Sequence, residues 1–207
     1  MKVVQRLLRS RGTGMLRAGA AGVCLLALAS SALESRAEEL QDIDIEEHTA
    51  RAILRSCDDP WGPRIGSVFL RERPSSEGVK LVDLLVRVRR GLEAGQHALH
   101  IHETGECSPC SAAKGHFDPG PNSNSSPDGN HPFHAGDLIN LTVDDNGQGN
   151  LLTITSRVTL SEGPLSVFDE DGSAFIVHVD PDTYCPDGEE AGCAGGARAA
   201  CGVIRSH

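Results

Sequence analysis

From about Thr49 onward, the chain consists of short apolar runs separated by turn-forming residues. Leucine and β-branched residues dominate runs such as Val79–Val88, a composition typical of β-strands. The Asn-Gly pair within Asp144–Gly147 is a strong signal for a hairpin between two such runs. The other strands that we expect are Ile65–Arg71, a strand that begins at His97, Leu138–Val143, Asn150–Ser156, Ala174–Val179 and Ala197–Ile204.

No amphipathic helix of useful length appears in the sequence. Several short strands with regular turns therefore predict an all-β fold, an antiparallel sandwich or barrel of about eight strands. Two long loops, Glu103–Gly136 and Asp180–Gly196, interrupt this pattern. Long loops in compact domains are usually either functional or disordered. Because each of these loops starts or ends beside histidines and contains cysteines, we expect both loops to be functional.

The first 37 residues have the pattern of an export signal. Basic residues precede an apolar run, Ala20–Leu33, and Ser35-Arg36-Ala37 resembles a signal-peptidase site. The run is too short to span a bilayer, so we predict a signal peptide over residues 1–37 rather than a retained anchor. Lipid attachment at Cys24 is a further alternative, although Val23 fits poorly before it. We expect residues 38–49 to form an acidic mobile leader and residues 50–207 to form one domain.

Removal of residues 1–37 would leave 13 basic and 28 acidic residues, a net charge of −15. This charge argues against nucleic acid as a partner and against stable contact with an anionic membrane. It also opposes the attraction of an anionic substrate.

Seven cysteines are present, and Cys24 lies within the predicted signal peptide. The remaining six are Cys57, Cys107, Cys110, Cys185, Cys193 and Cys201. An even number behind a signal peptide predicts disulfides in an oxidising compartment, either the periplasm or the extracellular space. Buried free thiols or a thiolate zinc site are the alternatives, but Cys107-x-x-Cys110 has no second pair to match it.

Histidines supply the most specific chemical signal. His100 and His102 point to the same face of a strand, whereas His97 points to the other face. Seven of the nine histidines lie between His97 and His178. Imidazole-rich sets suit copper and zinc, and an added carboxylate suits zinc better than copper. The candidate metal ligands are His100, His102, His116, His131, His134, Asp137 and His178.

At this point the sequence resembles the copper,zinc superoxide dismutase family. The matching segments are His97–Glu103, Gly115–Pro119, His134–Leu138, Val177–Asp182 and Gly195–Ile204, and their joint spacing is far more specific than any single segment. The resemblance implies a Greek-key β-barrel and dismutation of superoxide to oxygen and hydrogen peroxide. It also implies copper and zinc as cofactors, superoxide as the substrate and a possible homodimer.

The resemblance also implies roles for individual residues. The copper ligands would be His100, His102, His116 and His178, and His116 would bridge to a zinc ion held also by His134 and Asp137. Asp182 would link the two sites from behind the ligands, Arg198 would dock superoxide, and His116 would supply protons. Cys107 and Cys201 match the disulfide of the family. We further expect Cys185 to pair with Cys193, which leaves Cys57 with Cys110, one of fifteen possible connectivities.

Two departures from the family pattern affect these expectations. A third zinc histidine is expected midway between His116 and His134, but Asn122–Ser126 contains none. His131 is the spare histidine, so the fourth zinc ligand is either His131 or water. The loop before Arg198 contains no lysine to attract the substrate, but it contains the acidic residues Asp180, Asp182, Asp187, Glu189 and Glu190.

An alternative function is an exported copper-binding protein on the same fold without significant dismutase activity. A copper carrier has no need of an arginine that docks anions, so Arg198 favours the enzyme. A disulfide-stabilised adhesion domain gives no reason for five aligned histidine segments.

Overall fold

The computed structural model describes residues 47–120, 134–185 and 191–207. These residues form nine strands and one short 3-10 helix, η1 (Cys110–Ala113). The strands are β1 (Thr49–Ser56), β2 (Gly66–Pro74), β3 (Lys80–Val88), β4 (Gly95–His97), β5 (Leu99–His102), β6 (Leu141–Val143), β7 (Gly149–Thr155), β8 (Ala174–His178) and β9 (Arg198–Ser206). The predicted signal peptide, nearly all of the predicted acidic leader and His131 lie outside the described residues.

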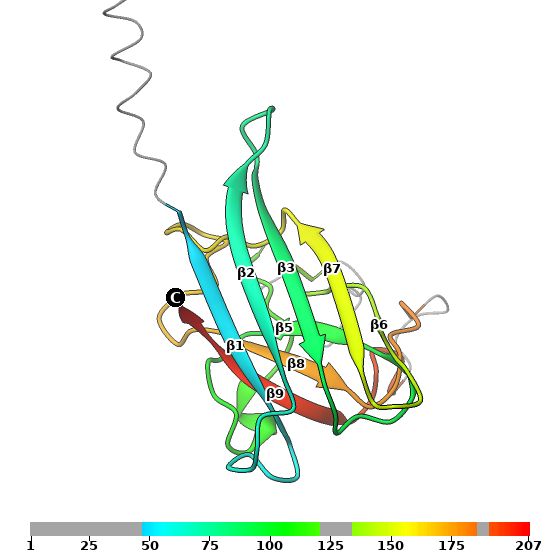
Figure 1. The fold of residues 1–207 in the computed structure, drawn as a ribbon. Coiled ribbons are helices and arrows are strands. Elements are labelled where there is room, and N and C mark those ends of the chain that lie inside the picture. Colours follow the sequence, from blue (N-terminus) through cyan, green and yellow to red (C-terminus); the bar gives the residue numbers. More distant parts are fainter. Residues whose placement is uncertain (1–46, 121–133, 186–190) are drawn as a thin grey trace, which may run out of the picture. The chain divides into compact units, whose positions relative to one another are not determined.

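All strand pairings are antiparallel, and the strand order is β4-β6-β7-β3-β2-β1-β9-β8-β5. In Figure 1, β1, β2, β3 and β7 lie side by side in front of β5, β8 and β9. The connection from β3 to β4 passes β7 and β6, as in a Greek key. The all-β, antiparallel, Greek-key prediction is therefore confirmed. No helix in the described part of the chain is long and apolar enough to cross a membrane.

The two edge strands of the sheet, β4 and β5, are separated in sequence by Ala98 alone. Both backbone polar groups of Ala98 are bonded to the region of β8, because its N–H donates to Asp180 O and its carbonyl accepts from His178 N–H, each at 2.9 Å. The sheet therefore nearly closes into a barrel at this residue. The single strand predicted from His97 is split here, which is one reason why nine strands form instead of about eight.

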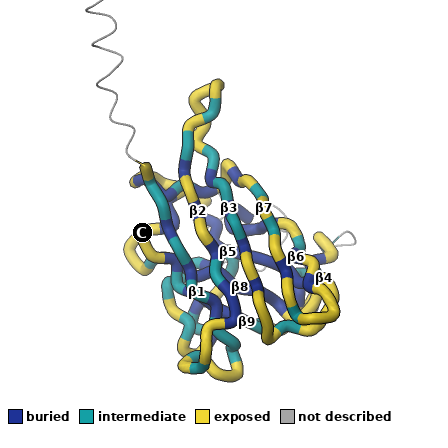
Figure 2. The backbone as a smooth tube through the Cα atoms, in the orientation of Figure 1, coloured by how far each residue is buried: buried dark blue, intermediate teal, exposed yellow. Residues whose placement is uncertain are grey.

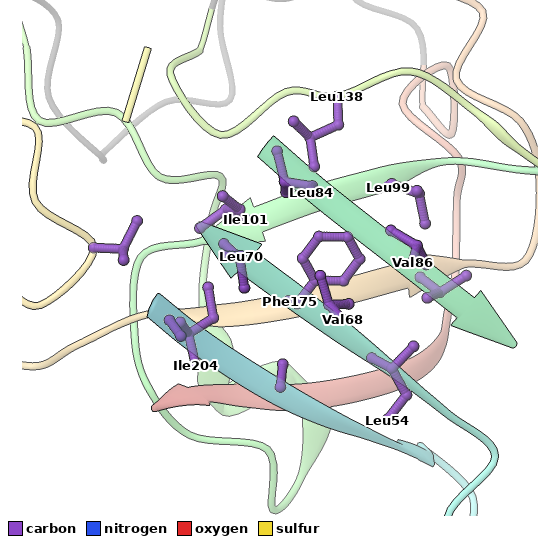
Figure 3. Packing of buried hydrophobic residues seen from close by; sticks show 14 of the residues in the cluster. Leu54, Val68, Leu70, Leu84, Val86, Leu99, Ile101, Leu138, Phe175 and Ile204 are labelled. Atoms are coloured by element: carbon purple, nitrogen blue, oxygen red, sulfur yellow. The ribbon is translucent and has the colours of Figure 1, made fainter. Parts of the chain in front are cut away.

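The barrel encloses one large apolar core. Side chains on alternating positions of β1, β2 and β3 point into it, and Phe175 from β8 lies near its centre (Figure 3). Complete burial of a leucine, valine or phenylalanine side chain stabilises the fold by about 1.5–3 kcal/mol. The outer face of β8 is also covered, because Ala174 and Ile176 pack with η1 residues in a second, smaller cluster. This second layer lies beside the histidines.

Three disulfides hold the loops to the barrel. Cys57–Cys110 joins the end of β1 to η1, and Cys107–Cys201 joins the segment before η1 to β9. Cys185–Cys193 closes part of the loop between β8 and β9. These are the pairs expected from the sequence. The segment that leads to His116 is thus anchored at two covalent points.

Predicted and observed strand limits agree closely except at two places. β1 was not predicted as a separate strand, and only Leu141–Val143 of the predicted Leu138–Val143 forms a strand. Leu138 donates from its backbone N–H to Leu99 O at 3.1 Å, so this part of the predicted strand pairs with β5. That pairing brings the neighbouring residues Asp137 and His134 toward β5.

Candidate metal centre

The candidate centre is built on the outer face of β5. Leu99 and Ile101 point into the core, so His100 and His102 point outward, as the period of a strand requires. Both histidines are nevertheless fully buried, because loop segments cover them. His97, on β4, lies apart from them, with Nδ1 2.8 Å from His178 O and Nε2 2.9 Å from Glu93 O.

Backbone pairing with β5 brings the two covering segments into place. Phe117 N–H donates to Ile101 O at 2.8 Å, and Ile101 N–H donates to Gly136 O at 2.9 Å. Glycine is required at residue 136, because a Cβ there would overlap the carbonyl oxygen of Ile101. The two segments carry His116 and His134 to the face already occupied by His100 and His102.

Four histidines form the first group of potential metal ligands. His100, His102, His116 and His178 each offer a ring nitrogen, and these four atoms lie within 4.8 Å of one another. The Nε2 atoms of His102 and His178 are 3.4 Å apart. The ring centroids of His100 and His116 are 3.9 Å apart. Such a set of buried imidazoles suits copper or zinc.

The opposite nitrogen of each strand histidine is held by an oxygen atom. His100 Nε2 is 2.9 Å from Asp182 Oδ2, His102 Nδ1 is 2.9 Å from Lys114 O, and His178 Nδ1 is 3.0 Å from Gly196 O. An N–H that donates to an oxygen fixes the ring orientation and leaves the other nitrogen as the electron-pair donor. The donor set therefore fits a metal ion that binds neutral imidazoles.

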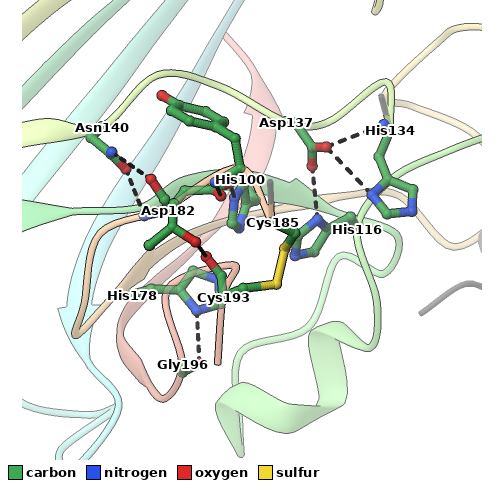
Figure 4. A network of polar contacts seen from close by, with 12 residues as sticks. His100, His116, His134, Asp137, Asn140, His178, Asp182, Cys185, Cys193 and Gly196 are labelled. Atoms are coloured by element: carbon green, nitrogen blue, oxygen red, sulfur yellow. Dashed lines mark hydrogen bonds and ion pairs between the residues drawn. A yellow bond between two sulfur atoms is a disulfide. The ribbon is translucent and has the colours of Figure 1, made fainter. Parts of the chain in front are cut away.

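His116 also belongs to a second group, which His134 and Asp137 complete. His116 Nδ1 lies 2.8 Å from Asp137 Oδ1, and His134 Nδ1 lies 3.4 Å from Asp137 Oδ2 (Figure 4). The backbone N–H of His134 donates to the same Oδ2 atom at 3.1 Å. Two imidazoles and a carboxylate are ligands that suit zinc. One ring thus lies between the two groups and is a member of both.

The protonation states suit metal binding. Burial lowers the pKa of His100 to about 4, although its hydrogen bond to Asp182 acts in the opposite direction. Burial likewise lowers the pKa of His178 to about 3 and that of His102 well below its ordinary value. Burial tends to raise the pKa of Asp137, but hydrogen bonds from His116 and His134 outweigh it and lower the pKa. Near neutral pH, the three strand histidines are neutral and Asp137 is ionised.

Asp182 is held rigidly behind His100. Its Oδ1 accepts a hydrogen bond from Tyr184 N–H at 2.7 Å, and its backbone exchanges two hydrogen bonds of 2.9 Å with the side chain of Asn140. Asp182 was expected from the sequence but Asn140 was not, because a single asparagine after an apolar residue has no distinctive pattern. Cys185–Cys193 closes the chain just beyond Tyr184.

Arg198, the first residue of β9, lies beside the first group. Its guanidinium donates to the carbonyl oxygens of Cys110 and Lys114, and its positive charge acts to lower the pKa values of His102 and His178. Lys114 O therefore accepts from both Arg198 and His102. The arginine is half-buried and its position depends on the segment that the two disulfides anchor.

A contact made by a second arginine, Arg157, was not expected from the sequence. Arg157, which follows β7, donates from its guanidinium to the backbone carbonyl of Asp137. Its position in the sequence, distant from every histidine segment, gave no signal.

Of the acidic residues expected before Arg198, Asp180 and Asp182 are described, whereas Asp187, Glu189 and Glu190 lie outside the described residues, as does the His131 candidate.

Comparison with known proteins agrees with this geometry. The sequence profile of the family described as "Copper/zinc superoxide dismutase (SODC)" matches residues 65–204. "Superoxide dismutase [Cu-Zn] 2" of Aquifex aeolicus is 44% identical over 113 residues, which cover 52% of this chain and 63% of the relative. "Superoxide dismutase [Cu-Zn]" of Deinococcus radiodurans is 39% identical over 130 residues, covering 56% and 66%. The chain thus spans slightly under two thirds of the length of these relatives.

Solved structures of SOD-like proteins are also similar to this chain. A SOD-like protein from Bacillus subtilis is 29% identical with a TM-score of 0.56, covering 74% of this chain and 96% of that one. A double mutant of the same SOD-like protein is 32% identical with the same TM-score and covers 95% of its chain. The family uses copper and zinc, and the two donor groups of this chain suit those metals. From the profile match over residues 65–204, the chain belongs to the copper/zinc superoxide dismutase family.

Proposed function

We propose that this protein is a superoxide dismutase, which converts two superoxide anions and two protons into oxygen and hydrogen peroxide. The observation that carries the proposal is the position of His116 in both donor groups, with Arg198 beside the all-histidine group. A simple copper carrier needs neither a second group nor a half-buried guanidinium next to the first.

In this proposal His100, His102, His116 and His178 hold copper, and His116, His134 and Asp137 hold zinc. His116 would be shared by the two groups, and its Nδ1 is the atom that lies beside Asp137. The fourth zinc ligand would be His131 or water. Asp182 acts on the copper group through His100 and thereby orients a ligand without touching the metal.

A bound copper ion would supply the one-electron redox chemistry that dismutation of superoxide requires. Arg198 would attract and orient each anion through charge-assisted hydrogen bonds, an interaction that is strong at a partly desolvated site. His116 would carry a proton to the reduced product through Nε2, the ring nitrogen that does not face Asp137. Arg198 keeps its place because two backbone carbonyls accept from it.

We further propose export to the periplasm or beyond. The three disulfides support an oxidising compartment, in agreement with the predicted signal peptide. The expected homodimer and the expected lack of stable membrane contact stay predictions.

The test combines metal analysis with a superoxide assay on the purified protein. We expect about one copper per chain and rapid dismutation, and we expect Arg198→Glu to keep the copper while the rate falls by about 10- to 100-fold. Arg205→Glu, which makes the same charge change at the exposed end of β9, serves as the matched control. Copper binding without dismutation in the unaltered protein would favour the copper-carrier alternative. Equal rate losses in both variants would show that Arg198 acts only through net charge.

A further inference from the structure

Six arginines lie on or next to β1, β3 and β9 and line two cavities on the outside of the sheet. We call this region the arginine face, and its members are Arg51, Arg55, Arg64, Arg87, Arg89 and Arg205. Buried and less buried residues alternate along β1 and β3, as the colours of the tube show (Figure 2), and Arg51, Arg55 and Arg87 are among the less buried ones. On β1, for example, Ala52 and Leu54 enter the core, while Arg51 and Arg55 lie on the other side.

The arginine face is hollowed by two adjoining cavities. The larger, of about 420 Å³, is lined by Arg51, Arg55 and Arg205, and the smaller, of about 250 Å³, by Arg51 and the three other arginines. Arg51 and His207 line both cavities, so the two cavities are neighbours, and together we call them the depression. Among the residues that the structure describes, no aspartate or glutamate lines either cavity.

The charges of the arginine face are not neutralised within the described chain. Arg71 and Arg73, on the same sheet, have ion pairs of 2.9 Å with Glu47 and 2.8 Å with Asp83, whereas none of the six has a carboxylate partner in residues 47–120, 134–185 and 191–207. Arg51 lies directly opposite Arg205 in the pairing of β1 with β9. Like charges directly opposite each other destabilise a sheet, and an anion bound between them removes that cost.

Apolar side chains separate the guanidinium groups. Ile53 and Val203 line the larger cavity, and Phe69 and Leu85 line the smaller one. Phe69 is 37% exposed and sits directly between Arg51 and Leu85 in the strand register. The depression thus offers anion-binding groups at intervals, with apolar surfaces between them that can pack against the faces of sugar rings.

We propose that the arginine face binds an acidic polysaccharide that lies along the two cavities. Guanidinium groups recognise carboxylate and sulfate groups in a bidentate manner, and the interleaved apolar surface accommodates the rings that carry these groups. None of the candidate metal ligands lines either cavity, and binding would hold the protein near an acidic polymer while the proposed dismutation continues. Counterions released from the polymer would add to the affinity at low salt.

Two other occupants fit less well. A second copy placed by a two-fold axis would bring arginines against arginines, because such an interface is self-complementary. A planar anionic membrane would approach the acidic remainder of the protein as well, since the segment after residue 37 carries a net charge of −15. A thread-like polyanion can instead follow the depression, where no aspartate or glutamate of the described residues lines either cavity.

The test measures binding of the purified protein to polygalacturonate and to dextran sulfate at several salt concentrations, with neutral dextran as the control polymer. We expect binding to both acidic polymers that weakens as salt increases, and no binding to neutral dextran. The double variant Arg51→Gln/Arg205→Gln should bind at least about 10-fold more weakly, and its plot of log K against log salt should be shallower by about two.

Arg71→Gln/Arg73→Gln is the matched control, because it removes the same charge from arginines that are already paired with carboxylates. We expect it to retain affinity within about threefold and to keep the salt slope. Dismutase activity and thermal stability report whether each variant is folded. Equal losses in the two double variants would overturn the proposal, as would no binding at about 50 mM salt. Tighter binding to anionic vesicles or to duplex DNA than to both polysaccharides would also overturn it.

Discussion

His116 connects the two donor groups because its two ring nitrogens face in different directions. Nδ1 lies 2.8 Å from Asp137, while the ring centroid lies 3.9 Å from that of His100 and 5.0 Å from that of His102. The two groups therefore share one rigid ring. The strand histidines on the first side are each oriented by one oxygen, and burial keeps them neutral.

That burial predicts how the metal-free protein responds to acid. An unfolded histidine has a pKa near 6.5, whereas burial lowers the pKa of His100 to about 4 and that of His178 to about 3. As pH falls below about 6.5, the unfolded chain therefore binds protons that the folded chain excludes, and stability decreases toward pH 4. Each such histidine contributes up to about 1.4 kcal/mol per pH unit in this window.

Thermal or urea unfolding of the metal-free protein between pH 7 and about pH 4.5 checks this expectation. His178→Gln should give a shallower dependence on pH, because it removes one titrating group, and His207→Gln, at an exposed position, is the control. A stability that is flat over this range would contradict the role given to the buried histidines.

At the scale of residues, the sequence predicted the candidate metal ligands better than the backbone groups that orient them. Period-two spacing placed His100 and His102 on one face, and the family resemblance supplied His116, His134, Asp137 and His178, all of which the structure brings together. The carbonyl oxygens of Lys114 and Gly196 were not predicted. Every residue has a backbone carbonyl, so only the folded path of the chain reveals which of them orient a ring.

Among the elements, the covering segment from Cys107 to His116 is the one on which the centre most depends. It carries η1, the Lys114 carbonyl shared by His102 and Arg198, and His116 itself. Cys107–Cys201 and Cys57–Cys110 fix it to β9 and β1, so the barrel determines its position. The sequence predicted these anchors but not the split at Ala98, because no residue pattern shows where a strand passes from one sheet edge to the other.

Removal of Cys107–Cys201 and removal of Cys185–Cys193 should lower the free energy of unfolding by different amounts. Cys107 and Cys201 are 94 residues apart, whereas Cys185 and Cys193 are 8 apart. Because the entropy lost by the unfolded chain grows with loop length, Cys107→Ser/Cys201→Ser should lose about 4–5 kcal/mol and Cys185→Ser/Cys193→Ser about 3 kcal/mol or less. Urea unfolding of the metal-loaded proteins measures both values.

The longer disulfide should also affect the centre. Its loss should lower the dismutation rate more than its effect on folding explains, because the Lys114 carbonyl that holds Arg198 would move. The short disulfide lies near Tyr184 and Asp182, so its loss should act mainly through His100 and copper affinity. The opposite ranking of the two stability losses would show that the unfolded chain is not the main origin of the effect.

For the whole molecule, the distribution of charge matters more than its total. The segment after residue 37 carries a net charge of −15, and the loop before Arg198 has no lysine. The arginine face collects six positive charges on the opposite side of β1 from the core, and its larger cavity reaches Cys110, whose carbonyl holds Arg198. Composition predicted the acidic total, but the grouping of arginines depends on strand register and could not be read from it.

The final prediction concerns the effect of salt on dismutation. When a protein attracts an anionic substrate over a long range, added salt screens the attraction and slows the reaction. In the proposed function, the net charge would repel superoxide and the lysine-free loop would give no attraction, while Arg198 would act only at close range. We therefore expect the rate to change little, or to rise slightly, between about 10 mM and 150 mM ionic strength, where the Debye length falls from about 30 Å to 8 Å. Arg51→Gln/Arg205→Gln separates the contributions, because it should leave this shallow dependence unchanged if the arginine face does not guide superoxide. A steep fall in rate with salt that this double variant abolishes would show instead that the arginine face attracts the substrate toward Arg198.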